Sequence, residues 1–197
     1  MSSTVVIAVV VIALIAVVGV IVLAAYNGLV SARNRCDEAW SGIDVALKRR
    51  HDLIPNLVET VKGYAAHETQ AFEAVTKARS AAIGARTPQE SARAEGLLTQ
   101  ALAGLFAIAE AYPQLRAVES FTQLQGELTQ TEDQIAAGRR LYNADVQAYM
   151  TRREQFPGAL VAGPFGFSPR PYFELDEPAD REPVKVDFGT AQPPTGA

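Results

Sequence analysis

The residues of this chain with the most evident chemical potential lie in one charged run: Lys48, Arg49, Arg50, His51 and Asp52. Successive residues on a helix point about 100° apart, so these side chains cannot share one face. Arg50 has the same seven-residue phase as Cys36, Ile43 and Leu57, on the margin of an apolar stripe. We therefore expect Arg50 or His51 to be partly buried and paired, which can specify the register of packed helices. The alternatives are a solvated helix face, or a surface that docks a partner, a phosphate or lipid headgroups.

The usual metal-binding and catalytic constellations are missing from the sequence. Lys48 precedes His51 by three residues and Tyr64 precedes His67, so the Glu-x-x-His pairs of dimetal helical bundles do not occur. Cys36 lies fifteen residues before His51, about 22 Å along a helix, which is too far for a nucleophile and its base. Its place on the apolar stripe favours a buried, inert thiol. We expect no catalytic residue, no cofactor and no metal site.

Composition excludes one broad class of function and bounds the size of the fold. The chain has 197 residues, a formal net charge of −4 and a pI near 5.3, which argues against a general nucleic-acid binder. Its single cysteine rules out an internal disulfide framework. Without an apolar N-terminal stretch and a proline-rich tail, the rest is the size of one ordinary domain.

The apolar stretch runs from Val5 to Ala25 and contains no charged residue. Its 21 residues span the roughly 30 Å hydrocarbon core of a bilayer as a helix. Thirteen are Val or Ile, which favour strands in water, but an isolated strand in lipid would leave its amides unpaired. The stretch therefore predicts a single transmembrane anchor over residues 1–25. A cleaved signal peptide is the alternative, and a positively charged start and a clear cleavage site are both missing for it.

The charges that flank the span predict its orientation. No Lys or Arg precedes the span, whereas Arg33 and Arg35 follow it closely. The positive-inside rule then places the N-terminus outside and the body in the cytoplasm.

After the span the sequence becomes amphipathic with a seven-residue repeat. Trp40, Leu47, Ile54 and Val61 share one phase, as in the seam of a helix packed in a bundle. Pro55 falls inside this phase. It predicts one long helix kinked near Pro55, with a short break capped by Asp52 as the alternative. We expect the membrane helix to continue into this one and helical structure to extend to about Gly84.

Two further helices are predicted. Thr87, Pro88 and Glu90 form a capping box that starts one of them. The other covers about 40 residues from Gln114 and carries a seven-residue apolar repeat: Phe121, Leu128, Ile135, Tyr142 and Tyr149. The alternate positions are poorly apolar, namely Thr131, Gly138 and Asp145, which favours a multi-helix bundle over a two-stranded coiled coil.

The last segment, residues 157–197, contains eight of the eleven prolines and should not be helical. We expect residues 161–167 to lie extended on a surface, and the acidic stretch beyond Phe173 to be mobile. Residues 184–188 alternate as in a short strand or docked strip. The sequence thus predicts an all-α protein. Residues 1–25 form the anchor, residues 26–156 an antiparallel up-and-down helical bundle, and residues 157–197 an extended Pro/Gly-rich tail.

Several motifs resemble those of the LemA family across residues 26–175. The most specific is Leu47-Lys48-Arg49-Arg50-His51-Asp52-Leu53-Ile54-Pro55-Asn56-Leu57-Val58, accompanied by Trp40-Ser41, Tyr112-Pro113, Tyr142-Asn143 and Phe156-Pro157. Arg116 and Met150 depart from the usual pattern. The resemblance implies a bacterial membrane-anchored helical bundle and no established activity, cofactor or catalytic residue.

The favoured function is a non-enzymatic, membrane-anchored scaffold at the bacterial envelope that self-associates and presents an interaction surface. Its expected partners are membrane lipids, through the N-terminal helix, and further copies of the same chain. The alternative is an adaptor or regulator of a membrane enzyme such as a protease, acting through residues 48–52 and the tail. An enzyme with an unrecognised site is the third hypothesis, and it requires a polar cleft with convergent titratable groups.

Overall fold

A computed structural model describes residues 2–174 of the chain. Within that range every regular element is a helix: α1 (Ser3–Lys62), α2 (Thr69–Gly84), α3 (Pro88–Ala111), α4 (Pro113–Arg116), α5 (Glu119–Glu154) and α6 (Gly158–Ala162). The all-helical class and the long apolar N-terminal helix are therefore confirmed. The strand expected at residues 184–188 and the mobility expected for the acidic stretch lie outside the described residues.

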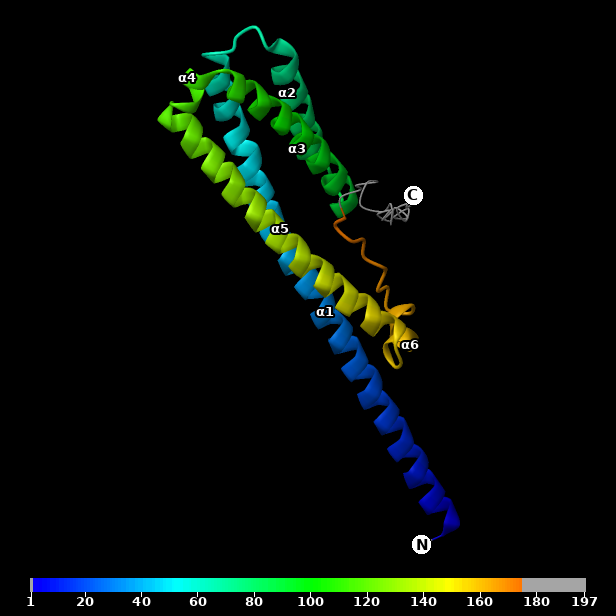
Figure 1. Cartoon of the computed structure of the whole chain (residues 1–197). Coiled ribbons are helices and arrows are strands. Elements are labelled where there is room, and N and C mark those ends of the chain that lie inside the picture. Colours follow the sequence, from blue (N-terminus) through cyan, green and yellow to red (C-terminus); the bar gives the residue numbers. More distant parts are fainter. Residues whose placement is uncertain (1, 175–197) are drawn as a thin grey trace, which may run out of the picture.

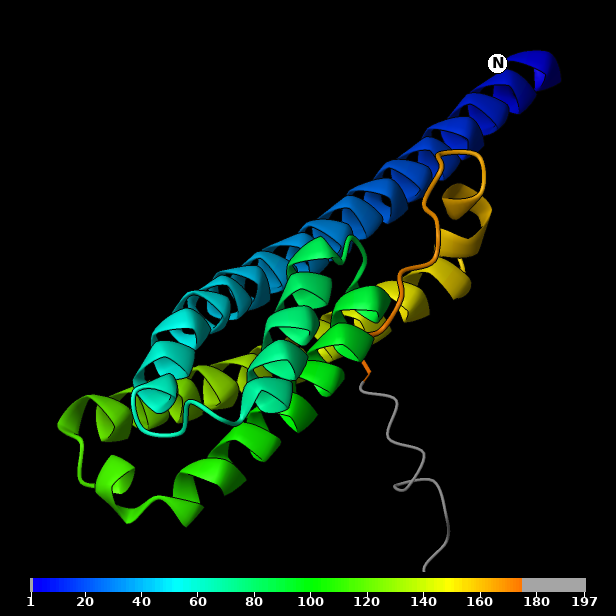
Figure 2. The same ribbon diagram turned by 90° about the horizontal axis from the view of Figure 1, so that it is seen from above.

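The long helix α1 organises the molecule (Figure 1). Its apolar first third stands free of the other elements, is long and apolar enough to cross a membrane, and buries none of its most apolar residues. Along the rest of α1, α5 lies beside it and runs in the opposite direction (Figure 1). The α2–α3 hairpin lies against the far half of this pair, as the view from above shows (Figure 2).

Close packing of α1 on α5 explains the small residues of the α5 repeat. Gly138 faces Ile43 so closely that a Cβ at Gly138 would lie 2.9 Å from Ile43 Cγ1. Thr131 is fully buried, and Asp145 forms an ion pair with Arg35 at 3.5 Å. The seven-residue repeat of α5 is buried throughout. These alternate positions are thus small or polar because α1 occupies the space where a zipper would place leucine.

The interior consists of two hydrophobic clusters that follow each other along α1. The proximal cluster, which is the one nearer the N-terminus, joins residues 29–47 of α1 to residues 135–149 of α5 and to the segment after it. The distal cluster joins residues 54–61 of α1 to α2, α3 and the start of α5. Arg50 and His51 fall between the two clusters, in the gap between Leu47 and Ile54.

The structure tests four expectations about element boundaries. One long helix through Pro55 is confirmed, and the alternative, a break capped by Asp52, is wrong. Helical structure ends at Gly84 as predicted, but it is interrupted, because α1 ends at Lys62 and residues 63–68 turn the chain back into α2. A bend at residues 117–118 separates α4 from α5, so the last long helix begins at Glu119 rather than at Gln114.

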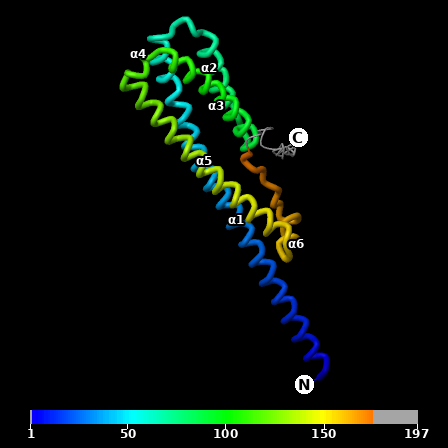
Figure 3. The backbone as a smooth tube through the Cα atoms, viewed as in Figure 1, coloured from blue at the N-terminus to red at the C-terminus, as the bar shows by residue number. Residues whose placement is uncertain are grey.

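The fourth expectation, an extended conformation of residues 161–167, is wrong for residues 161–166. The segment after Pro157 begins with the short helix α6, because Val161 and Ala162 bury their side chains against the proximal cluster. After a turn at residues 163–166, residues 167–174 run back along the α1–α5 pair as a non-helical strap (Figure 3). The capping box at Thr87 and Glu90 is confirmed, with both reciprocal hydrogen bonds present.

We predict that Gly138→Ala destabilises the protein relative to Gly126→Ala on the same helix. Both changes gain up to about 1 kcal/mol of helix propensity. A Cβ at Gly126 meets nothing within 4 Å, whereas one at Gly138 collides with Ile43, and such overpacking costs about 1–3 kcal/mol. Urea unfolding in detergent micelles, followed by circular dichroism, measures both free energies. Equal stability of the two variants would show that α1 and α5 do not approach closely here.

Candidate functional site

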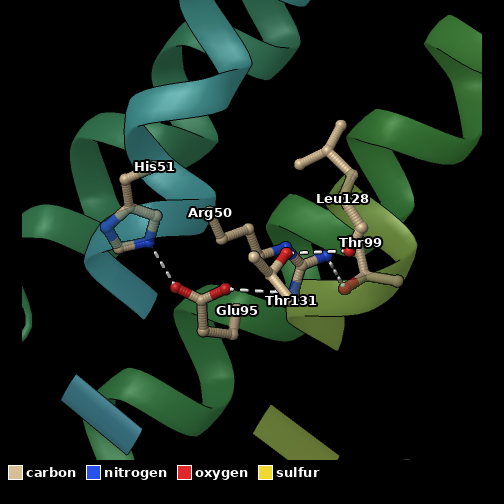
Figure 4. Close-up of polar contacts among 6 residues, drawn as sticks. All are labelled: Arg50, His51, Glu95, Thr99, Leu128 and Thr131. Atoms are coloured by element: carbon tan, nitrogen blue, oxygen red, sulfur yellow. Dashed lines mark hydrogen bonds and ion pairs between the residues drawn. The ribbon is translucent and has the colours of Figure 1, made fainter. Parts of the chain in front are cut away.

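A buried charge cluster joins α1 to α3 between the two hydrophobic clusters. Arg50 and His51 are only 5% and 8% exposed, and both reach Glu95, which is 3% exposed. Arg50 Nη1 donates to Glu95 Oε2 at 3.2 Å, and His51 Nε2 lies 2.5 Å from Glu95 Oε1. Arg50 Nη2 also donates to Thr99 Oγ1 at 2.9 Å (Figure 4). The Glu95 carboxylate is therefore hydrogen-bonded to two adjacent residues of α1, one at each of its oxygens.

The direction of the hydrogen bond between His51 and Glu95 depends on which ring nitrogen carries the hydrogen. An ionised carboxylate only accepts hydrogen bonds. With Glu95 in that form, His51 carries its hydrogen on Nε2 and donates it to Glu95. Thr131 of α5 lies beside the cluster but donates to the Leu128 carbonyl at 2.8 Å, so its hydroxyl is satisfied within its own helix (Figure 4).

The backbone of His51 is part of the same arrangement. In a regular helix the His51 carbonyl would accept from the N–H of residue 55, but that residue is proline and has no N–H. Arg79 of α2 supplies the missing donor, with its Nε 2.7 Å from the His51 carbonyl oxygen. This interhelical bond satisfies a carbonyl that would otherwise lack its helical partner, and it ties α2 to the charge cluster.

The five residues of the charged run separate into two groups. Arg50 and His51 are buried and paired, as expected for residues that set register. Lys48, Arg49 and Asp52 are exposed, and Arg49 forms a surface ion pair with Glu127 at 3.6 Å. A docking surface built from this run is thus limited to its three exposed members.

Sequence reasoning missed Glu95, Thr99 and Arg79. The signal for Glu95 was present, because it lies three residues after Ala92 and three before Leu98 on the buried face of α3. A lone carboxylate on such a face requires a cationic or hydrogen-bonding partner from another helix. Nothing in the sequence marks Arg79, whose role depends on how α2 folds back.

A pocket of about 290 Å³ opens beside the cluster, between α1, α3 and α5. Polar groups on its wall are Arg50, Thr99, Gln125, Thr129 and Glu132, and apolar groups include Leu102 and Phe106. Within residues 2–174, no three His, Cys, Asp or Glu side chains gather as a metal site would require. The arrangement is suited to hydrogen bonding and to holding helices in register, and the absence of enzymatic activity stays a prediction.

A second polar network holds the strap against α5. Tyr142 and Tyr149 donate their hydroxyls to the carbonyls of Pro171 and Ser168, at 2.9 and 2.8 Å. Asn143 exchanges two hydrogen bonds with the backbone of Phe173. Burial raises the pKa of Tyr142 to about 12, partly offset by Arg170, and burial also raises the pKa of Tyr149. Burial likewise raises the pKa of the Cys36 thiol, which agrees with an inert cysteine.

We predict that Glu95→Gln lowers the free energy of unfolding by about 3–5 kcal/mol, because it leaves Arg50 buried without its counter-charge. The matched control is Glu127→Gln, which removes a half-exposed pair with Arg49 and should cost less than about 1 kcal/mol. Urea titrations of the two variants in the same detergent compare the costs directly. A similar, small cost for both would mean that the cluster does not hold the helices together.

We also predict that alkali loosens the strap. Neutral Tyr142 stabilises the folded state fully below its unfolded pKa of about 10, and this contribution is lost as the pH rises towards its folded pKa of about 12. The fluorescence of Trp40, whose ring lies 5.4 Å from Tyr142 and 5.5 Å from Phe173, reports the change. Between pH 10 and 12, Tyr142→Phe should reduce the fall in the free energy of unfolding with pH. The control Tyr64→Phe, at an exposed position, should leave this pH dependence unchanged. If Tyr142→Phe leaves the pH dependence of the free energy of unfolding unchanged, ionisation of Tyr142 is not the cause of the alkaline loss of stability.

Comparison with known proteins places these features in a family. The model of the LemA family matches residues 39–188. The chain is 28% identical over 185 residues to two proteins of Paramagnetospirillum magneticum, Magnetosome protein MamQ 1 and MamQ 2, covering 81% of this chain and 68% of each relative. It is 26% identical, with the same coverage, to Magnetosome protein MamQ of Magnetospirillum gryphiswaldense. Since this match covers about three quarters of the chain, including Arg50, His51, Glu95 and all of α5, the chain belongs to the LemA family.

Proposed function

We propose that this protein is a non-enzymatic scaffold anchored in the bacterial inner membrane by residues 5–25. The observation that carries the proposal is the continuity of α1. One unbroken helix of 60 residues contains both the exposed apolar span and the central packing surface of the body. At 1.5 Å per residue it is about 90 Å long, so the body is held at a set distance from the span along the helix axis. No hinge separates anchor and body.

The orientation proposed is the one that the flanking charges favour, with the N-terminus outside and a single crossing. Folding adds cations to this end of the body. Arg152 at the end of α5 donates to the Gly28 carbonyl at 3.3 Å, near Arg33 and Arg35 of α1. This cluster supports a cytoplasmic body, because positive residues near a span favour the cytoplasmic side.

Self-association must use surfaces other than the heptad seams. The buried repeats of α1 and α5 are occupied by packing within the chain. Large apolar side chains remain exposed elsewhere on the body, including Val45 at 68%, Leu141 at 59% and Leu97 at 58%. We propose that contacts between copies use one of these positions.

We predict that the full chain, extracted from membranes in mild detergent, has the mass of several copies. Single changes of Val45, Leu97 and Leu141 to Glu locate the contact, since the one at the interface should lower the mass to a monomer with unchanged helix content. Size-exclusion chromatography with light scattering makes the measurement. If the chain is a monomer that co-purifies with a membrane enzyme in a fixed ratio, the adaptor hypothesis is favoured instead. A monomer that co-purifies with no other protein would exclude both the self-associating scaffold and the adaptor.

A further inference from the structure

The short helix α6 and the residues around it form a cap at the membrane end of the body. We use "cap" for residues 155–166, between the end of α5 and the strap. The cap packs on α1 at residues 24–29, where a small cavity of about 180 Å³ is lined by Ala24, Gly28 and Phe156 among others. In Figure 1, α6 lies beside α1 just where the free N-terminal stretch begins. If the span ends at Ala25, the cap therefore lies at the level of the lipid headgroups.

The cap exposes three large apolar side chains within ten residues. Phe156 is 77% exposed, Leu160 68% and Phe165 55%. Other residues of the same segment, Gly158 and Val161, are buried. The exposed side chains are therefore held outwards by a folded segment. A cluster of this kind on a soluble surface marks a place where another apolar phase makes contact.

The cap is held in this position by close packing. A Cβ at Gly158 would lie 1.9 Å from the Arg152 carbonyl oxygen, so the chain can turn this tightly only with glycine there. Gly166 has a positive φ of 72°, which favours glycine at the turn into the strap. Tyr26 packs edge-on against Phe165 and Phe167, with ring centroids 5.2 and 5.6 Å apart. The aromatic residues thus gather around the helix where it would leave the bilayer.

The charges around the cap match a phospholipid surface. The Arg152 guanidinium lines the cavity under the cap, and Arg33 lies over the Phe167 ring at 5.4 Å. Aromatic side chains at the headgroup level with arginines beside them are the usual pattern of an interfacial membrane contact. Anionic headgroups supply the complementary charge.

We infer that the cap is a second membrane contact, in which Phe156, Leu160 and Phe165 enter the boundary between headgroups and acyl chains beside α1. This inference rests on the proposed function, because it places the cap relative to a span at residues 5–25. The contact restrains the tilt of α1 on one side and so fixes the direction in which the body projects.

The test uses full-length single-cysteine variants in a Cys36→Ala background, each labelled with an environment-sensitive fluorophore. Leu160→Cys probes the cap. Ile83→Cys is the control, an exposed apolar residue of α2, a helix that packs on the distal cluster. Ile15→Cys probes the span itself. The variants are reconstituted into vesicles of phosphatidylcholine and phosphatidylglycerol, and quenching is measured with doxyl-labelled lipid and with aqueous iodide.

We predict that labels at positions 160 and 15 are quenched several-fold more by doxyl lipid than the label at 83, which iodide quenches instead. A label at 160 that behaves like the label at 83, while position 15 is quenched by lipid, overturns the inference and leaves the anchor intact. A label at 160 shielded from both quenchers also overturns it, because a protein surface then covers the cap. If position 15 is not quenched by lipid, the proposed anchor itself is wrong.

Discussion

The Glu95 carboxylate imposes the constraint on which the rest of the fold depends. It lies where water is excluded and accepts from two neighbouring residues of α1, so α1 and α3 have one register in which the charges are matched. A shift of either helix by one residue would leave Arg50 buried without a counter-ion, at a cost of several kcal/mol. Hydrophobic packing alone tolerates such shifts more readily. The cluster therefore specifies how the distal half of the molecule is assembled on α1.

Pro55 shows how the same region keeps a helix intact where local rules predict a break. A proline removes one helical hydrogen bond and crowds the preceding turn. In this protein the freed carbonyl belongs to His51 and accepts from Arg79 instead. The proline thus creates an acceptor on the surface of α1 that an incoming helix can recognise. The hydrogen bond from Arg79 to the His51 carbonyl therefore both satisfies α1 at Pro55 and holds α2 against α1.

Much of this architecture can be read from the sequence, because it rests on periodic signals. The apolar span, the buried repeat of α5 and the capping box at Thr87 each depend on residues within one element. The turn at residues 63–68 was not predicted, since the apolar phase of Val61 continues into Phe72 with no strong breaker except Gly63. Burial of Arg50 was expected from its phase. Its partner Glu95 was not identified, because pairing across 45 residues depends on how the chain folds back.

An unbroken α1 also restricts how copies can assemble, if the span crosses the membrane as proposed. Residues 25 and 50 lie about 38 Å apart along the helix axis, and no hinge between them can change that distance. Every copy then presents the same residues at the same height above the same membrane face. Copies in one membrane can be related only by rotation about an axis along the membrane normal, since any other two-fold axis would invert one anchor. Closed rings and parallel dimers satisfy this condition, and antiparallel pairing of two bodies does not.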